Sequence, residues 1–276
     1  MKKIRSKLLL VIVFFGLVTY TNLAFANSDL ERCRTLISQL SFNEGYAVCK
    51  NAAEQGIPDA QFLLGNMYYF GEGVTQDYAE AVRWYRAAAE QGDIDAEFAL
   101  GGAYYLGNGE TQNFTEAAKF FRSAAEQGHV DSKYYLGYIY FNGKGVTQSY
   151  EKAAKWFRAA AEEGNEGAQF NLALMYENGN GITQDYTEAA SWHRAAAEQG
   201  NASAQFSLGR MYIFGNGLIQ NYLFAHMWLN ISAANGHITA APFRNVVSSL
   251  MSYEQIADAQ LLARQCVKSN YTDCDN

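Results

Sequence analysis

The stretch AAAEQG at residues 87–92 decides the fold, because it returns at a fixed interval along the chain. Its closing glycine recurs every 36 residues across five consecutive periods, with no insertion or deletion. That series is Gly56, Gly92, Gly128, Gly164, Gly200 and Gly236. A tyrosine series keeps the same step: Tyr68, Tyr104, Tyr140, Tyr176 and Tyr212. Self-similarity at a period of about 20–50 residues is typical of a solenoid, in which each unit buries its apolar face against its neighbours.

Each unit is predicted to contain two helices joined by a glycine turn. Within residues 58–70, Leu64 and Met67 share one helix face, and Gly71 and Gly73 end that helix. Five N-cap residues then start the second helices: Asp77, Asn113, Ser149, Asp185 and Asn221. Three of them are followed three residues later by a glutamate that would complete a capping box, namely Glu80, Glu116 and Glu188. The sequence therefore predicts an all-α superhelix of stacked antiparallel helix pairs.

Small residues recur in the middle of the first helices, where glycine costs about 1 kcal/mol relative to alanine. The series is Gly65, Gly101, Gly137, Ala173 and Gly209. A cost repeated in four units indicates close helix–helix contact, so a large residue at Gly137 is expected to destabilise the array.

Four segments follow from the period. Residues 1–26 are predicted to be a signal peptide, 27–56 an N-terminal capping helix pair, 57–236 five regular units, and 237–276 C-terminal capping helices and a tail. In the last segment, we expect helices over 240–250 and 253–267. Terminal units of solenoids diverge because one of their faces meets water.

The N-terminal 26 residues combine a basic end, a short apolar run and the small-x-small sequence Ala24-Phe25-Ala26. This layout is typical of a cleaved secretory signal. The alternative, an uncleaved membrane anchor, is disfavoured by the shortness of the apolar run. The sequence thus predicts an exported protein, periplasmic or secreted, with no membrane-spanning segment in its mature chain.

All four cysteines lie outside the regular units. In an exported chain they predict two disulfides at the ends of the array, with Cys33–Cys49 and Cys266–Cys274 the favoured pairing among three formal possibilities. No CxxC spacing or histidine cluster accompanies them, so we expect neither a redox nor a metal site, and no cofactor.

Charge narrows the class of partner. Removal of residues 1–26 takes four of the 21 basic side chains and none of the 28 acidic ones, which leaves a net charge of −11. Such a surface repels phosphate backbones and anionic lipids. We therefore expect a protein or peptide partner and no binding to nucleic acid.

The residues from Ala60 to Gly92 read AQFLLGNMYYFGEGVTQDYAEAVRWYRAAAEQG, which closely resembles the Sel1-like repeat, a relative of the tetratricopeptide repeat. The resemblance covers 52–236, and 225–264 looks like the closing unit of bacterial Sel1-like proteins. It implies an exported bacterial protein that acts as an adaptor or scaffold rather than as an enzyme.

In arrays of this kind the first helices line the concave face. Some of their positions are constant in this sequence, and two series vary from unit to unit, as a recognition surface would. The candidate binding residues from those series are Asn66, Tyr69, Tyr105, Tyr138, Phe141, Leu174, Glu177, Arg210 and Ile213. The alternative is plain surface variation. A groove rich in aromatic side chains suits a peptide or an amphipathic helix.

Two other functions stay open. Some cysteine-rich Sel1-like proteins have been described as β-lactamases, but their units each carry a cysteine pair, and the regular units here carry none. No GxSxG, HExxH or P-loop motif is present, and no catalytic residue is proposed. A module that binds cell-wall peptidoglycan is the remaining alternative.

Overall fold

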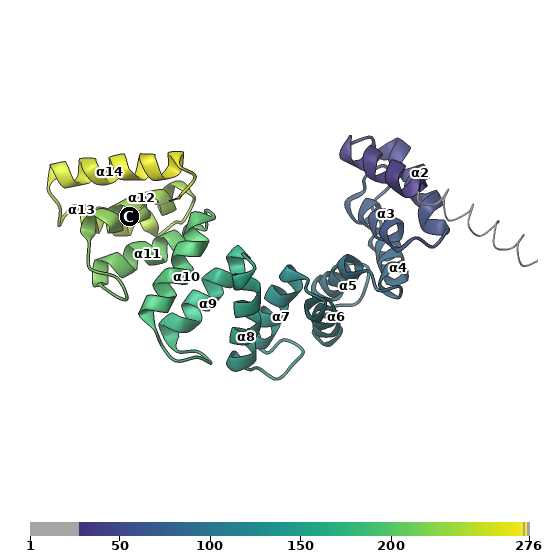
Figure 1. Ribbon diagram of the computed structural model, residues 1–276, viewed down its shortest axis with the longest axis horizontal. Helices are drawn as coiled ribbons and strands as arrows, with labels where there is room; N and C mark the ends of the chain where they lie inside the picture. Colours follow the sequence, from purple (N-terminus) through teal and green to yellow (C-terminus); the bar gives the residue numbers. More distant parts are fainter. Residues whose placement is uncertain (1–27, 273, 275–276) are drawn as a thin grey trace, which may run out of the picture. The chain divides into compact units, whose positions relative to one another are not determined.

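The computed structural model describes residues 28–272 and residue 274, and the regular elements of that part are all helices (Figure 1). The predicted signal peptide lies outside the described residues. Residues 28–38 are helical. The helices that follow are α2 (Phe42–Glu54), α3 (Pro58–Phe70), α4 (Tyr78–Ala89), α5 (Ile94–Leu106), α6 (Phe114–Glu126), α7 (Val130–Asn142), α8 (Tyr150–Glu162), α9 (Glu166–Asn178), α10 (Tyr186–Glu198), α11 (Ala202–Phe214), α12 (Tyr222–Ala234), α13 (Ala240–Ser248) and α14 (Tyr253–Lys268).

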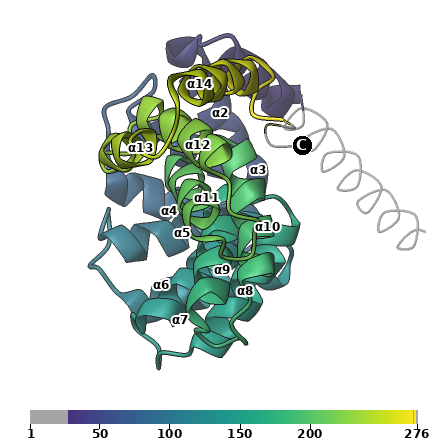
Figure 2. The same ribbon diagram turned by 90° about the vertical axis from the view of Figure 1, so that its left-hand side faces the viewer.

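The chain divides into two compact units, residues 1–129 and residues 130–276. In the described part of the first unit, α2 to α6 pack each against the next along the chain. In the second unit, α7 to α12 do the same, and α12 also packs against α13 and α14. Figure 2 shows α12 between α11 and α14. The predicted all-α fold of stacked helix pairs is confirmed, because each helix buries its apolar side against its neighbours in the chain.

The predicted N-caps are confirmed. Asp77 Oδ1 accepts hydrogen bonds from the backbone N–H groups of Ala79 and Glu80 at 2.9 and 3.0 Å, and the other four caps accept in the same way. The three reciprocal capping boxes were wrongly predicted. Glu80 lies instead 3.1 Å from Arg83, a cation one turn further along the exposed helix face. Within the described residues, the reciprocal box forms at Ser252 and Gln255.

The second glycine of each turn has a role beyond the turn itself. Gly73 adopts a φ of 71°, and a Cβ atom there would lie 2.3 Å from the carbonyl oxygen of Phe42 in the preceding second helix. Gly109 approaches Tyr78 in the same way, and Gly217 approaches Tyr186. No side chain fits at these points. The glycine therefore lets the turn of one repeat lie directly against the backbone of the helix pair before it.

The mid-helix glycines provide space for an aromatic or aliphatic side chain of the paired helix. A Cβ atom at Gly101 would lie 2.6 Å from the ring of Phe121, and one at Gly137 would lie 2.8 Å from the ring of Phe157. The expected close helix–helix contact is thus present. Its packing gain offsets the low helix propensity of glycine.

Adjacent glycines in α5 test this contact. Gly101→Ala should lower the free energy of unfolding by about 1–3 kcal/mol, because the new methyl group overlaps the Phe121 ring. Gly102→Ala should raise it by up to about 1 kcal/mol, because no neighbouring atom lies within 4 Å of the place that a Cβ would take there. Denaturant unfolding monitored by circular dichroism measures both. If both substitutions change the free energy of unfolding equally, the close contact between Gly101 and Phe121 does not limit the residue type at position 101.

The glutamine of the AAAEQG stretch connects successive helices. Gln91 Nε2 donates to Gln61 Oε1 at 2.8 Å, and Gln61 Nε2 donates to the carbonyl of Ala53 at 3.3 Å. The same ladder of side-chain amides recurs as Gln199, Gln169 and Ala161, and as Asn235, Gln205 and Ala197. Buried amides need such partners. The ladder explains why this stretch repeats with so little variation.

One rung of the ladder is ionic. At the register position of Gln61 the third Sel1 repeat carries Lys133, which is 9% exposed, and its Nζ lies 2.5 Å from Glu163 Oε1. Glu163 occupies the register position of Gln91. The two substitutions compensate for each other, because a nearly buried ammonium group requires an anionic partner.

A double-mutant cycle tests this compensation. Glu163→Gln should cost about 1–2 kcal/mol of unfolding free energy, because it removes the counter-charge of Lys133 while Glu163 itself is partly solvated. Lys133→Gln combined with Glu163→Gln should recover most of that loss by restoring the amide pair found at Gln61 and Gln91. If chemical denaturation shows that the two substitutions change the free energy of unfolding additively, Lys133 and Glu163 do not act as a pair.

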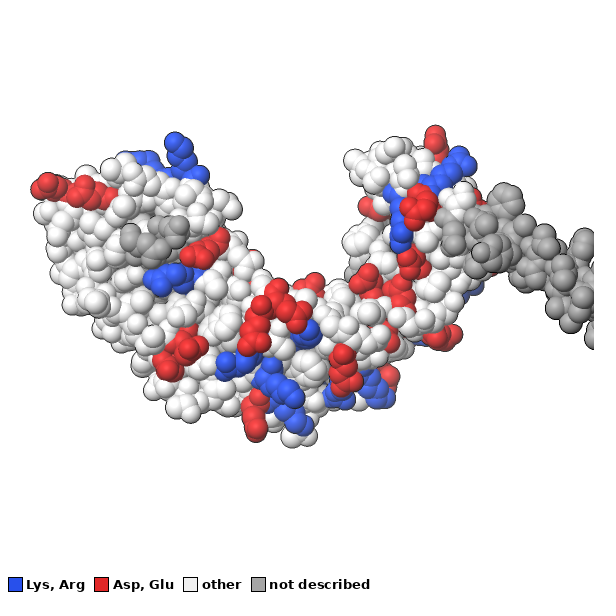
Figure 3. Space-filling view, viewed as in Figure 1, with Lys and Arg blue, Asp and Glu red and all other residues white. Residues whose placement is uncertain are grey.

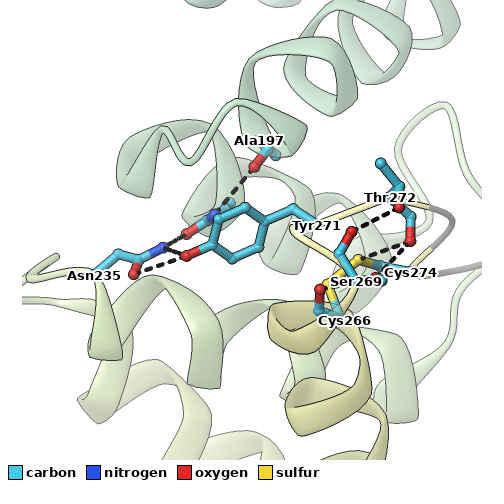
Figure 4. The surroundings of a disulfide bond; sticks show 8 residues. Ala197, Asn235, Cys266, Ser269, Tyr271, Thr272 and Cys274 are labelled. Carbon is cyan, nitrogen blue, oxygen red and sulfur yellow. Dashed lines mark hydrogen bonds between the residues drawn. A yellow bond between two sulfur atoms is a disulfide. The ribbon is translucent and has the colours of Figure 1, made fainter.

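Both ends of the described chain carry a disulfide, as the sequence favoured. Cys33 pairs with Cys49, and Cys266 pairs with Cys274. Near the second disulfide, Asn235 Nδ2 lies 3.2 Å from the hydroxyl of Tyr271 (Figure 4). Tyr271 therefore meets the last amide of the ladder where a further unit would otherwise lie.

His226 makes stability depend on pH. The side chain is buried in α12, and burial together with the positive charge of Arg244 lowers its pKa from the usual 6.5. The folded protein therefore binds fewer protons at this site than the unfolded chain does. Stability is fully present above about pH 6.5 and is lost as the pH falls from there toward the folded pKa.

Thermal unfolding between pH 7.5 and pH 5 should show this loss. We expect His226→Gln to flatten the pH dependence of Tm, because the substituted group does not titrate. Part of the slope should remain, since burial also lowers the pKa of His237. If the pH dependence of Tm in His226→Gln is identical to that of the wild type, His226 does not contribute to it.

Candidate functional site

The nine candidate binding residues lie in the C-terminal halves of the first helices α3, α5, α7, α9 and α11, and all are partly buried. Three of them, Asn66, Tyr69 and Tyr105, belong to the first unit; the others belong to the second. Their side chains differ in what they contact, and the structure does not gather them all at one place.

Three of the aromatic candidates pack within their own helix pair. The ring of Tyr69 lies 5.0 Å from that of Tyr78, and the ring of Tyr105 lies 5.3 Å from that of Phe114. Phe141 meets Tyr150 in the same edge-on manner. Each pair joins the end of a first helix to the first residue of the second helix. These rings stabilise the glycine turn.

Other candidates also have structural contacts. Asn66 Oδ1 accepts a hydrogen bond from the hydroxyl of Tyr85 at 2.8 Å. The hydroxyl of Tyr69 accepts one from Asn108 at 3.0 Å. Lys144 Nζ lies 5.6 Å from the ring centre of Tyr138. Variation along these series thus reflects, in part, the partner that each side chain has in its own or the next repeat.

Sequence reasoning missed the most exposed apolar positions of the first helices. Phe70 is 63% exposed, Leu106 58% and Phe214 60%. Each is the last residue of its helix, directly before the capping glycine. Their place beside the capping glycine could have indicated this exposure in the sequence, because a large apolar residue beside a turn has no helix neighbour to cover it.

Two candidates of the second unit, Glu177 and Arg210, line a common pocket. Its volume is about 130 Å³, and it lies between the C-terminal ends of α9 and α11. The remaining lining residues are Asn178, Tyr186, Met211, Phe214 and Asn216. No ion pair within 4.0 Å joins Glu177 to Arg210 in the described structure, so the two charges face one space separately.

A buried histidine lies behind the carboxylate of Glu177. His193 is fully buried in α10, and its Nε2 atom is 3.3 Å from Glu177 Oε1. The contact is short enough for an ion pair when the imidazole is protonated, but neither ring nitrogen is aligned for a hydrogen bond. His193 occupies the register position of Tyr85, Phe121, Phe157 and Leu229 in the other units.

The surface charges are mixed. On the face shown in Figure 3, acidic and basic side chains lie interspersed among uncharged ones, and neither unit presents a continuous basic area there. Among the residues that the structure describes, no helix combines the length and apolarity needed to cross a membrane. Within the same residues, no group of three or more histidine, cysteine or acidic side chains is placed to hold a metal ion.

The Sel1 repeat pattern matches five consecutive segments: 58–93, 94–129, 130–165, 167–201 and 202–237. The chain belongs to the Sel1 repeat family. A comparison with curated proteins finds no match. The Sel1 segments cover the helix pairs from α3 to α12, so the pocket at Glu177 and Arg210 lies between the fourth and fifth of them.

Several solved structures are similar to this chain. A Sel1 repeat protein from Oxalobacter formigenes is 31% identical, with a TM-score of 0.73 over 88% of this chain and 96% of that one. A putative Sel1 repeat protein from Klebsiella pneumoniae is 24% identical, with a TM-score of 0.46 over 72% and 97% of the two chains. A protective antigen of uropathogenic Escherichia coli, c5321, is 22% identical, with a TM-score of 0.45 over 91% and 86%.

Proposed function

We propose that this Sel1 repeat protein is an exported, non-enzymatic scaffold that binds a protein or peptide partner through the first helices of its units. Sel1 repeats generally serve protein–protein interaction. The observation that carries the proposal is the exposure of Phe70, Leu106 and Phe214 at the ends of these helices. Exposed large apolar side chains at repeated positions are typical of surfaces that a partner covers.

The two disulfides support the export of the protein. Such bonds persist in oxidising compartments and are rare in the cytosol. Cys33 and Cys49 are fully buried and Cys266 nearly so, which suits a structural role at the ends of the array. Together with the signal peptide predicted at residues 1–26, they favour a periplasmic or secreted protein.

The varied positions are proposed to give specificity around the exposed side chains. Tyr69 and Tyr105 adjoin Phe70 and Leu106 along the chain, so these two apolar ends have a partly exposed aromatic neighbour, and Phe214 adjoins Ile213. Tyrosine provides a large contact area with little loss of side-chain entropy on binding. A peptide or amphipathic helix whose apolar side chains meet these ends would use both.

Proximity labelling in the native cell should identify the partner, and calorimetry with the purified pair should measure the affinity. We expect Leu106→Glu or Phe214→Glu to weaken binding by about tenfold or more, because each places a charge in a buried apolar contact. Both variants should keep the wild-type Tm, since the side chains are exposed. Leu261→Glu in α14, where the leucine is 47% exposed, is the matched control.

Unchanged affinity in Leu106→Glu and in Phe214→Glu would contradict this surface, as would an equal loss in Leu261→Glu. Sedimentation with peptidoglycan sacculi and turnover of a chromogenic β-lactam by the wild-type protein would instead favour the wall-binding or hydrolase alternatives.

A further inference from the structure

The pocket between α9 and α11 exists because one ring is missing. At the register position of Tyr69, Tyr105 and Phe141 the fourth Sel1 segment carries Glu177. In the first and third segments the ring there covers the first residue of the next helix, at 5.0 and 5.1 Å. With a carboxylate in place of the ring, Tyr186 borders open space instead.

A second substitution accompanies the first. Phe141 and Phe157 have ring centroids 6.5 Å apart, and their register equivalents are Glu177 and His193. An apolar ring pair has thus become a carboxylate beside a fully buried imidazole whose nitrogens make no hydrogen bond. Burial of unbonded polar groups destabilises a protein. The His193 ring keeps the aromatic packing of its position, 5.6 Å from the ring of Phe170, whereas the carboxylate of Glu177 borders the pocket, where a ligand would account for it.

The opposite wall of the pocket carries Arg210, whose guanidinium contacts an aromatic ring. Arg210 forms no ion pair within 4.0 Å in the part of the chain that the structure describes, and its guanidinium lies 6.0 Å from the ring centre of Phe206. The pocket therefore presents an anion and an unpaired cation. The rings of Tyr186 and Phe214, both partly exposed, border the same space.

A ligand with one charge would satisfy one wall and face a like charge on the other. A ligand that carries both charges pairs with both walls and brings no net charge into the pocket. A carboxylate suits the guanidinium in particular, because the two can form parallel hydrogen bonds. A volume of about 130 Å³ limits such a ligand to a few heavy atoms beyond its charged groups.

We propose that this pocket binds a small α-amino acid as its zwitterion. The ammonium group pairs with Glu177, the carboxylate pairs with Arg210, and the side chain of the ligand lies against Tyr186 and Phe214. The site shares Phe214 and the varied positions Glu177 and Arg210 with the scaffold surface proposed above, but it does not include Leu106. Loss of partner binding in Leu106→Glu therefore does not bear on it.

Titration of the full-length mature protein with L-alanine, followed by ¹H–¹⁵N NMR, tests the site. We expect saturable shifts that include the Arg210 side chain, with a Kd of about 1 mM or below. N-acetyl-alanine lacks the ammonium charge and alaninamide lacks the carboxylate, so each should bind about tenfold more weakly than alanine.

Two variants assign the charges. Glu177→Gln should weaken alanine binding but leave N-acetyl-alanine binding unchanged, and Arg210→Gln should weaken alanine binding but leave alaninamide binding unchanged. Glu162→Gln, at an exposed position of α8, is the control and should bind as the wild type does. If Glu177→Gln does not fold, Arg210→Gln alone decides, because Arg210 lies at the surface of the pocket.

The proposal is overturned if alanine produces no saturable chemical-shift change. It is also overturned if N-acetyl-alanine and alaninamide bind as tightly as alanine. It is equally overturned if Glu162→Gln weakens binding as much as Arg210→Gln does.

Discussion

The stacking of these helix pairs depends on a backbone approach that tolerates no side chain. At Gly73, Gly109 and Gly217 the turn of one repeat lies against a carbonyl group at the start of the preceding second helix, where a Cβ atom would fall about 2.1–2.3 Å from the oxygen. Such a contact fixes both the residue type and its distance along the chain. An inserted residue would move a side chain into the carbonyl, which explains why the 36-residue period shows no insertion.

Around this contact, side-chain amides and glycine gaps complete the packing. Gln91 and Gln61 link three successive helices, and Gly101 lets the ring of Phe121 approach the backbone of α5. Both are nearest-neighbour interactions. Stability in such an array is therefore approximately a sum over adjacent repeats. The pairs of Lys133 with Glu163 and of Gln127 with Glu97 show that a rung can change its polar chemistry while its two members stay bonded.

Much of this architecture could be predicted because it depends on residues that lie close together in the sequence. N-caps such as Asp77 and the glycine turns follow from residue type and period, whereas the pairing of Cys33 with Cys49 was the favoured one of three possibilities. The capping boxes failed because the backbone N–H of each N-cap residue already donates to a tyrosine carbonyl of the first helix, as Asp77 does to Tyr68. The inter-repeat role of Gly73 could not be predicted from the chain, because its partner is Phe42, 31 residues earlier.

The candidate site was harder to predict, since packing and recognition use the same positions. Tyr69 and Tyr105 vary in identity yet also brace their own turns. The exposure of Leu106 was signalled by its position directly before a capping glycine and not by the apolar periodicity of its helix. Glu177 and Arg210 were singled out by their variation. Their common pocket depends on two helices, α9 and α11, whose spacing only the fold supplies.

The tail after α14 has a consequence for assembly. A solenoid unit is complementary to its neighbour at both ends, so an uncovered end invites another molecule to dock in the same register, and repeated docking produces open filaments. Here the phenol of Tyr271 meets the amide of Asn235, and the bond between Cys266 and Cys274 keeps that short segment in place. Helices α13 and α14 cover α12 after the fifth Sel1 repeat, and the disulfide fixes Tyr271 beside them. A disulfide persists under oxidising conditions, so reduction should loosen the cover at this end of the array.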